Sequence, residues 1–348
     1  MSTKRNKAIM VVAPNNNGMS NIGDFIQAQA AKQFIGNADV YIERDRELNK
    51  YDGNDVDMIM NGWFMDYGEN FPPSNKIHPL YVAFHINKLG LPGLLSQAAI
   101  EHYKKYQPIG CRDTHTAELL KEHGIDAYFS GCLTLTLGQT YRNEKKEDKA
   151  YVVDAYFSTH NLSKRPKLLM SSFLYLLCNY NGIKKITSKK GENGLKALLH
   201  NSIFLKEYSK AFDKKTLIDA EYICQFNHEI ANEYLSYNKK MDYAEQLIKK
   251  YAKAKLVITS RIHCALPCTG LETPVVYIKN INEDKASNDR FGGLIDFFNV
   301  IKWRGDGLEL PQEHKKISKV NTPPLKNNWK PYAERMIQTC KNFVTSTQ

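Results

Sequence analysis

Two side chains that together suit acid/base chemistry on an anion, Arg261 and His263, directly follow an apolar run in the second half of the chain. The run at 256–258 predicts a buried strand, and the small apolar residues at 262–269 predict a helix after a tight turn. Where a parallel strand ends and its helix begins, backbone N–H groups and the helix dipole favour an anion. A guanidinium grips a phosphate or carboxylate through two parallel hydrogen bonds, and an imidazole carries a proton near neutral pH. With Ser260 in the turn as a further binding group, the segment predicts proton transfer on an anionic substrate.

A strand, loop and helix at the start of the chain repeat this arrangement. The apolar run at 8–12 predicts a strand, and the loop at 14–24 is rich in Asn and Gly before an apolar helical pattern. Asp24, at the start of that helix, has two interpretations: it caps the first turn, or it acts as a base or binds a hydroxyl. Asn21 is a weaker candidate for substrate binding. The loop has neither the G-x-G-x-x-G spacing nor a P-loop lysine, so neither nucleotide cofactor is expected.

Three further polar residues lie at predicted strand ends. Arg112 either binds an anion there or forms a surface ion pair with Asp113, and its position favours neither interpretation. Asn61 lies in a small-residue turn after a strand and is a candidate sugar contact. His228 stands just past the predicted strand at 223–226, where a hydrogen-bonded packing role is the alternative to substrate binding.

The elements that must position these residues alternate between β and α, which predicts a parallel, doubly wound sheet. A length of 348 residues exceeds what one hydrophobic core usually organises, so we expect two domains. The polar run at 140–149 is the expected linker, and the stretch at 126–137 before it is expected to be a strand. The expected division is 1–142, 149–326 and a C-terminal helix within 327–348.

Composition is that of a soluble globular protein, with 24% charged and 42% hydrophobic residues. No run reaches the roughly 20 apolar residues that span a bilayer, and the N-terminus is unlike a secretory signal. The apolar helix expected at 168–178 is too short to span and should lie in the core or be partly buried. Seven scattered cysteines, an odd number, fit reduced thiols. We therefore expect a cytoplasmic protein.

The net charge of +11 reflects 48 Lys and Arg against 37 Asp and Glu. The excess is spread along the chain and no nucleic-acid-binding module accompanies it, so nucleic acid is not an expected partner. Attraction to anionic substrates, or peripheral contact with the anionic inner face of the membrane, fits the charge better. Carboxylates at metal-binding spacing are missing from the sequence, so no metal is expected.

Three blocks of the sequence carry a resemblance to a known family. They are NIGDFIQAQA at 21–30, GCRDTHTAELLKEHGIDAYFSGCLTLTL at 110–137, and YAKAKLVITSRIHCALPCTGLETPVVYI at 251–278. In these blocks the chain resembles the polysaccharide pyruvyl transferases. The resemblance implies two Rossmann-like domains facing a cleft, as in type B glycosyltransferases. It also implies transfer of the enolpyruvyl group of phosphoenolpyruvate to two sugar hydroxyls, which gives a pyruvate ketal and phosphate.

The chemistry implied by the resemblance gives each candidate residue a role. Phosphoenolpyruvate is the donor substrate, its two anionic groups suit Arg261 and Arg112, and no other cofactor is expected. His263 is the expected general acid, and Asp24 the expected base or hydroxyl-binding group. The acceptor is a sugar or a lipid-linked oligosaccharide, bound on the side of the first domain, while the second domain holds the donor anion. The C-terminal helix is expected to pack back on the first domain. Oligomeric state leaves no signal in the sequence.

Two other functions fit the same residues. A nucleotide-sugar-dependent glycosyltransferase shares the architecture, and Arg261 would then bind a diphosphate. A noncatalytic subunit of a polysaccharide-assembly complex would use Arg261 and His263 only for packing. The sequence also departs from relatives at 61–65, where NGWFM replaces a glycine-rich turn.

Overall fold

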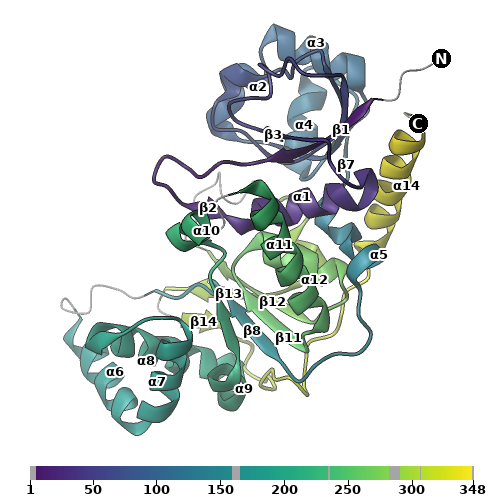
Figure 1. The fold of residues 1–348 in the computed structure, drawn as a ribbon. Coiled ribbons are helices and arrows are strands. Elements are labelled where there is room, and N and C mark those ends of the chain that lie inside the picture. Colours follow the sequence, from purple (N-terminus) through teal and green to yellow (C-terminus); the bar gives the residue numbers. More distant parts are fainter. Residues whose placement is uncertain (1–4, 159–164, 234–235, 282–290, 306, 347–348) are drawn as a thin grey trace.

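Two six-stranded sheets form the framework of the protein in a computed structural model, which describes residues 5–158, 165–233, 236–281, 291–305 and 307–346. Figure 1 shows one sheet above the other, with α1 (Ile22–Ile35) lying between them. The strands are almost all parallel and flanked by helices, so the expectation of a doubly wound, Rossmann-like α/β fold is confirmed.

The first sheet has the strand order β3-β1-β4-β5-β6-β7, and every pair is parallel. Its central strands β4 and β5 are buried over most of their length, as the nearly continuous apolar runs of a covered parallel sheet require. The strands are β1 (Asn6–Val11), β3 (Val40–Glu43), β4 (Val56–Phe64), β5 (Ile77–Ile86), β6 (Ile109–Cys111) and β7 (Ala127–Phe129). Its helices include α2 (Leu91–Leu94), α3 (Gln97–Tyr106) and α4 (Thr114–Glu122), with 3₁₀ turns η1 (Gly68–Asn70) and η2 (Lys88–Gly90).

The second sheet has the order β14-β13-β12-β11-β8-β9, with only the β13–β14 pair antiparallel. The strands are β8 (Ala150–Val153), β9 (Glu221–Ile223), β11 (Leu256–Thr259), β12 (Val275–Asn280), β13 (Asn299–Arg304) and β14 (Gly307–Glu309). The accompanying helices are α10 (His228–Glu233), α11 (Tyr237–Lys253) and α12 (Ile262–Gly270), with the 3₁₀ turn η5 (Ile295–Phe297). Strand β11 and helix α12 are the strand and helix expected around Arg261.

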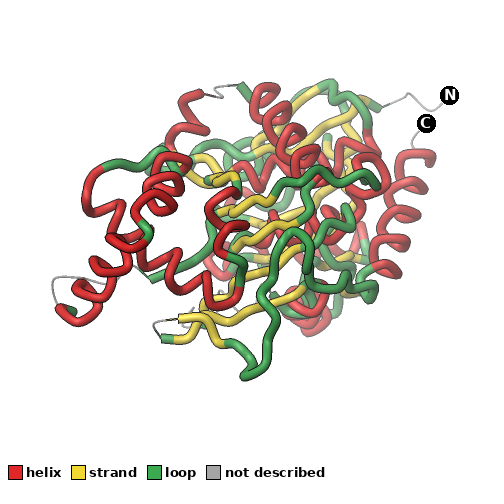
Figure 2. Tube along the Cα trace, turned by 90° about the horizontal axis from the view of Figure 1, so that it is seen from below, coloured by secondary structure: helices red, strands yellow, loops and turns green. Residues whose placement is uncertain are grey.

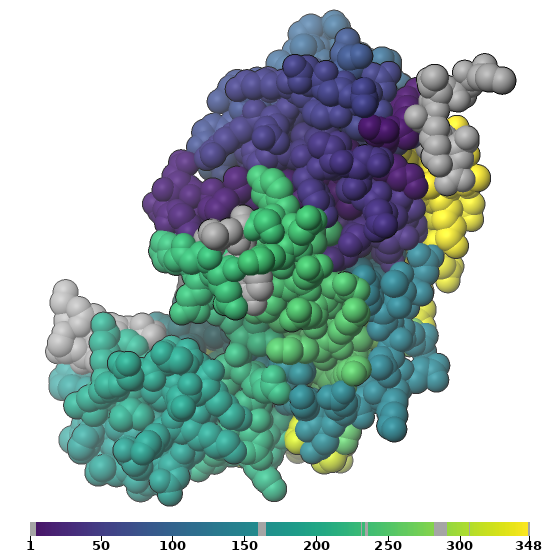
Figure 3. Space-filling view, in the orientation of Figure 1, coloured from purple at the N-terminus to yellow at the C-terminus, as the bar shows by residue number. Residues whose placement is uncertain are grey.

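A helical lobe, residues 166–219, is inserted between β8 and β9. It consists of α6 (Pro166–Cys178), α7 (Tyr180–Lys189), α8 (Gly194–Ala211) and α9 (Lys214–Asp219). Figures 1 and 2 show α6, α7 and α8 gathered at one side of the molecule, opposite the C-terminal helix α14 (Lys330–Ser346). Figure 3 shows the lobe as a bulge at the lower left of the molecule. Its helices α7, α8 and α9 also pack on the second sheet, because they share one buried apolar cluster with residues of β8, β11 and β12.

The two sheets share one apolar core. A single cluster of buried residues includes Phe25 and Ile26 of α1, Leu247 of α11, Leu266 of α12 and Met336 of α14. A short antiparallel pair, β2 (Ser20–Asn21) with β10 (Phe226–Asn227), also joins the two halves of the chain. The division into two domains stays a prediction. Helix α14 packs against the 3₁₀ helix η3 (Leu133–Leu137) and strand β5 of the first half.

Two expected strands are wrong. Only 127–129 of the stretch at 126–137 is a strand, and 133–137 forms the buried 3₁₀ helix η3 (Leu133–Leu137), followed by α5 (Gly138–Tyr141). Gly131, with a φ of 77°, turns the chain out of the sheet before η3. The strand expected at 223–226 ends at Ile223, and the next two-residue strand, β10, leaves the sheet to pair with β2.

Candidate functional site

A cavity of about 280 Å³ lies where the carboxyl ends of the two sheets meet, and we call it the joint cavity. Its first-half lining follows strands β1, β3, β4 and β6, while its second-half lining follows β9 and β11. This is the place where open α/β sheets bind ligands. The lining residues are Val12, Ala13, Asn15, Met19, Asn21, Asp24, Arg44, Trp63, Asp66, Arg112, Gln225, Phe226, Ser260, Arg261, Ile262 and His263.

The starts of helices α1 and α12 approach each other closely at the wall of this cavity. Asn21 caps α1 by accepting a hydrogen bond from the backbone N–H of Gly23 at 3.1 Å. A Cβ added at Gly23 would lie 2.9 Å from Cβ of His263, closer than two such atoms pack. Glycine at 23 is therefore required by the contact that brings the first turn of α1 against His263.

His263 lies between groups of the first half of the chain. Its Nε2 is 3.4 Å from Nη1 of Arg112, and its Nδ1 is 3.5 Å from Nε2 of Gln27. The same Gln27 nitrogen donates to Oδ1 of Asp24 at 3.3 Å. The Gln27 amide thus connects Asp24 with His263, the two side chains that the sequence predicts to transfer protons. The sequence gives no sign of this role, because Gln27 fits the helical pattern of α1 like any other polar residue.

Arg112 is fixed deep in the wall, with only 1% of its surface exposed. Its neighbour Asp113 is engaged elsewhere: it caps α4 by accepting from the N–H of Thr116 at 2.8 Å and pairs with Nδ1 of His85 at 2.6 Å. Burial alone would raise the pKa of Asp113, but the hydrogen bond from His85 and the nearby charges lower it below its ordinary value. Arg112 is therefore not a surface residue, and its guanidinium reaches the cavity.

Arg44, a second buried arginine, was missed by the sequence interpretation. Its guanidinium binds Oδ2 of Asp45 through Nε and Nη2 at 3.1 and 2.5 Å, and Nη1 donates to the carbonyl of Trp63 at 2.7 Å. The charge also lies 4.9 Å from the Trp63 ring. Arg44 follows the end of β3, so the strand-end rule that found Arg112 and Arg261 could have found it as well.

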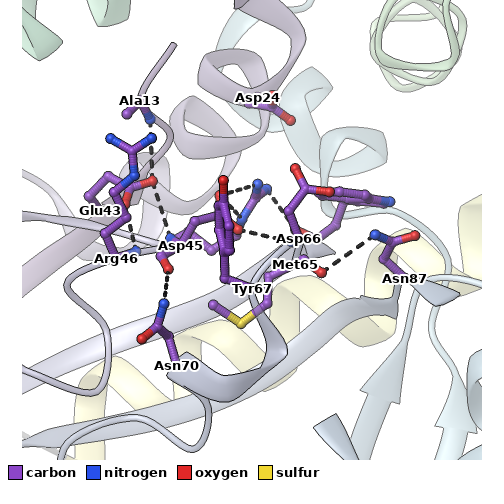
Figure 4. Close-up of polar contacts among 12 residues, drawn as sticks. Ala13, Asp24, Glu43, Asp45, Arg46, Met65, Asp66, Tyr67, Asn70 and Asn87 are labelled. Carbon is purple, nitrogen blue, oxygen red and sulfur yellow. Dashed lines mark hydrogen bonds and ion pairs between the residues drawn. The ribbon is translucent and has the colours of Figure 1, made fainter. Parts of the chain in front are cut away.

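A network of backbone and carboxylate contacts holds the loops around Arg44 (Figure 4). Glu43 accepts from the N–H groups of Ala13 and Arg46, at 3.3 and 2.7 Å. Asp45 accepts at Oδ1 from the N–H of Asp66 at 3.1 Å. Figure 4 shows Ala13, Glu43 and Arg46 at the left, Asp45 and Asp66 nearer the centre, and Asp24 on the helix above them. The first-half wall is therefore ordered by its own contacts.

Arg261 is held more loosely. Its side chain is 40% exposed, and its Nε donates to Oδ2 of Asp154 at 2.9 Å. Asp154 follows β8 with a φ of 41°, an uncommon conformation for a residue other than glycine, and its Oδ2 also accepts from the N–H of Gln225. The guanidinium lies 5.7 Å from the ring of Phe226. Asp154 thus orients Arg261, which lines the joint cavity.

Two carboxyl groups of the cavity have altered acidity. Burial raises the pKa of Asp24 above its ordinary value of 3.8, although the charges of Arg44 and Arg112 act to lower it. Burial also raises the pKa of Asp66, and the nearby Asp45 carboxylate raises it further. Because Asn21 supplies the helix cap, the capping interpretation of Asp24 is wrong, and a half-buried carboxyl that lines the cavity is what remains.

Three of the predicted binding residues are used differently. Ser260 lines the cavity, but its hydroxyl donates to the carbonyl of Ile278 at 2.7 Å and accepts from the N–H of Tyr156 at 2.8 Å. The turn predicted at Asn61 is wrong, because β4 continues to Phe64. Asn61 is 3% exposed, lies outside the cavity lining and donates to the carbonyl of Gln27 at 3.0 Å.

His228 is the third of these residues. It is exposed, lies near Gly18 and is also absent from the cavity lining. Its predicted strand end does not exist, because the chain has already left the second sheet at β10. The remaining five predicted residues, Asn21, Asp24, Arg112, Arg261 and His263, come together at the joint cavity.

The arrangement suits an anionic ligand and proton transfer. Three guanidinium groups from both sheets, a histidine and a carboxyl with raised pKa line one cavity. Over the described ranges of the chain, His, Cys, Asp and Glu side chains form no group of three or more that could hold a metal ion. Nor does any described helix have the length and apolar character needed to cross a membrane.

Fold and site together define an α/β protein with guanidinium, imidazole and carboxyl groups at the carboxyl ends of its two sheets. The family model described as polysaccharide pyruvyl transferase matches residues 21–282, which cover most of the chain. The chain belongs to the polysaccharide pyruvyl transferase family, and it is a transferase. This confirms the resemblance seen in the three sequence blocks.

The chain was also compared with solved structures and with curated proteins. The chain is similar to the crystal structure of a functionally uncharacterised protein from Klebsiella pneumoniae subsp. pneumoniae, at 14% sequence identity and a TM-score of 0.40. That similarity covers 84% of this chain and 89% of the other chain. No curated protein matches the sequence.

Proposed function

We propose that the protein transfers the enolpyruvyl group of phosphoenolpyruvate to two hydroxyls of a sugar, forming a pyruvate ketal and releasing phosphate. The observation that supports this most directly is the convergence of Arg44, Arg112 and Arg261 with His263 and Asp24 in one cavity. Family membership supports a pyruvate-containing donor and a sugar acceptor.

The donor carries a phosphate and a carboxylate, so its site must neutralise two anions. Guanidinium groups bind both kinds of anion through paired hydrogen bonds. Arg44 and Arg112 belong to the first half of the chain and Arg261 to the second, so in this proposal both halves hold the donor. The expected pairing of Arg112 with Arg261 on the donor stays part of this proposal, and Arg44 adds a third guanidinium group.

Ketal formation requires one proton delivery and two hydroxyl additions. His263 donates a proton to the methylene carbon of the donor, and the double-bond electrons form the new C–H bond. The neighbouring carbon becomes cationic, and a sugar hydroxyl adds to it while Asp24 accepts the hydroxyl proton. The bond from that carbon to the phosphate oxygen then breaks, and its electron pair leaves with the phosphate. The second hydroxyl adds to the same carbon and gives its proton to the departing phosphate, while the proton held by Asp24 returns to His263 through solvent. The arginines stabilise the departing phosphate.

A second, larger cavity suits the acceptor. It has a volume of about 820 Å³ and lies beside β8, β9, α10 and the helical lobe, so we call it the lobe cavity. Tyr156, Phe157, Tyr222 and Tyr243 contribute aromatic surface to it. Asp154 lines it as well while pairing with Arg261 of the joint cavity, so the two cavities adjoin at that ion pair. A sugar or a lipid-linked oligosaccharide bound there would face the donor. Since all residues of the lobe cavity belong to the second half, this proposal departs from the expectation that the first domain holds the acceptor.

The test is protection of the protein against heat by phosphoenolpyruvate. A ligand at a hundred times its dissociation constant adds about 2.7 kcal/mol of stability, which corresponds to a shift of a few degrees. We expect the shift in the wild-type protein and its loss in Arg261→Ala. Arg304→Ala is the matched control, because Arg304 pairs with Glu309 outside both cavities and its side chain is 64% exposed.

Each other outcome counts against the proposal. If phosphoenolpyruvate protects neither protein while a nucleotide sugar does, the protein uses a nucleotide-sugar donor instead. If neither ligand protects and Arg261→Ala merely destabilises the fold, Arg261 has only a packing role, as in a noncatalytic subunit. If Arg304→Ala also loses heat protection, the protection depends on the overall positive charge of the protein and not on binding at the joint cavity.

A further inference from the structure

Helix α6 of the helical lobe exposes a row of large apolar side chains to solvent, which we call the α6 stripe. Its members are Met170, Phe173, Leu174 and Leu177, with 64%, 44%, 57% and 60% of their surface exposed. Their spacing of three, four and seven residues places all four on one face of the helix. The opposite face is anchored, because Ser172 and Leu176 are buried within the lobe.

Lysine side chains flank the stripe on neighbouring helices. Lys206 of α8 donates to the hydroxyl of Ser171 at 3.3 Å. The ammonium group of Lys214 lies 5.8 Å from the ring of Tyr175. Beyond the end of α6, Lys184 of α7 lies 5.9 Å from an exposed tyrosine ring. The apolar face is thus bordered by cations whose stems cover the edges of the helix.

Acidic residues avoid this region. From 165 to 219 the sequence has eleven Lys and Arg and four Asp and Glu, so these 55 residues hold +7 of the total net charge of +11. Between 155 and 191 no Asp or Glu occurs at all. The charge that looked evenly spread along the sequence is therefore concentrated in the part of the fold that carries the stripe.

A row of large apolar side chains on a solvent-exposed surface normally marks an interaction site. A second copy of the chain is a poor occupant, because two lobes of the same high positive charge would face each other. Apolar side chains with flanking lysines instead match the interface of a bilayer that contains anionic lipids, where the stripe enters the acyl boundary and the lysines meet the headgroups.

We propose that the α6 stripe and its flanking lysines dock the protein on an anionic bilayer surface. The sequence had placed helix 168–178 in the core or on a partly buried face; in the structure one face is buried and the other is the docking surface. This assignment is independent of the reaction at the joint cavity.

Vesicle sedimentation tests the proposal with purified full-length protein. The vesicles contain equal parts phosphatidylglycerol and phosphatidylcholine, with pure phosphatidylcholine as the comparison. We expect wild-type protein to bind the anionic vesicles, and we expect the double substitution Leu174→Gln with Leu177→Gln to reduce partitioning by at least about tenfold. Binding should also weaken as salt rises.

The matched control replaces two apolar residues outside the lobe that are more exposed than Leu174 and Leu177. Leu89→Gln with Val320→Gln replaces side chains that are 74% and 90% exposed, and this variant should bind as wild type does. All variants keep the net charge unchanged. Heat protection by phosphoenolpyruvate should be the same in all of them, so a failure of docking is distinguished from a failure of the proposed reaction.

Four results would overturn docking: no binding of the wild type to anionic vesicles, equal binding to pure phosphatidylcholine, an unchanged Leu174/Leu177 variant, or an equal loss in the control. Sedimentation velocity identifies the second copy as the occupant if a wild-type dimer disappears in the Leu174/Leu177 variant while vesicles bind neither protein. An acidic protein partner would remain as the occupant if the wild type is monomeric and vesicles fail to bind it.

Discussion

The two sheets contribute arginines of different character to the joint cavity. Arg112 and Arg44, from the first sheet, are 1% and 4% exposed, and Arg44 is fixed by Asp45 and the Trp63 carbonyl. Arg261, from the second sheet, has a side chain that is 40% exposed and pairs with Asp154 at its Nε. One wall is therefore formed before a ligand arrives, while the opposite wall has a side chain that must be ordered by binding, at an entropic cost.

His263 lies where the two walls touch, and its replacement should have the largest effect. We expect His263→Gln to lower kcat by about 10²–10⁴-fold, because glutamine cannot deliver a proton. Donor binding should survive, since the arginines remain, so heat protection by phosphoenolpyruvate should persist in the variant. A kcat within a few-fold of wild type would show that the proton comes from another group, with Asp24 the next candidate.

Replacing the buried arginine should come next. We expect Arg112→Gln to reduce kcat/KM by about 10²–10³-fold, because a preorganised donor in a water-excluded wall is lost. Arg142→Gln is the matched surface control, since Arg142 pairs with Glu272 and is 48% exposed. Circular dichroism and thermal melts check that the variant folds. A loss no larger than that of the exposed Arg261 would contradict the distinction between the two walls.

The exposed arginine should act on binding more than on turnover. Arg261→Lys keeps the charge but loses the planar fork and the Nε contact to Asp154, so we expect KM for phosphoenolpyruvate to rise by about tenfold with kcat nearly unchanged. Asp154→Asn should shift KM in the same direction by a smaller factor, because it only releases Arg261. An unchanged KM in Arg261→Lys would refute the assigned role.

Asp24 should show its effect in stability. Its pKa is raised in the folded state, so the folded protein holds a proton that the unfolded chain has lost, and stability falls as pH rises from about 3.8 through the folded-state pKa. At neutral pH the ionised Asp24 side chain lowers the free energy of unfolding. We therefore expect Asp24→Asn to melt at a higher temperature while losing activity. The gain should shrink as the pH is lowered toward that window. A lower melting temperature at neutral pH would contradict the raised pKa.

Much of this site could be predicted from the rule that parallel sheets bind ligands at the carboxyl ends of their strands. The residues that were predicted wrongly or missed show where that rule stops working. Asp24, Arg112, Arg261 and His263 were found because each lies at a strand end or a helix start, which apolar periodicity reveals. Arg44 obeys the same rule but follows the short strand β3, whose pattern is weak.

Other features depend on tertiary contacts that leave no local pattern. Asn61 fails because β4 continues past it to Phe64, which leaves its side chain buried against α1. His228 fails because the chain before it has left the second sheet to pair with β2. Gln27 links Asp24 to His263 only because α1 and α12 meet at Gly23. The exposure of the α6 stripe is equally invisible in sequence, since an apolar face reads the same whether it is covered or not.

The shared core has a consequence for how the chain is made. Helix α1 presents Phe25 and Ile26 to partners that include Leu266 of α12, and β2 pairs with β10 far along the chain. At about 5–20 residues per second, the roughly 240 residues between Ile26 and Leu266 take roughly 12–48 seconds to synthesise. During that interval the apolar face of α1 has no second-half partner. Ribosome-associated chaperones are therefore expected to bind the nascent first half until the second half has been synthesised and can pack against α1.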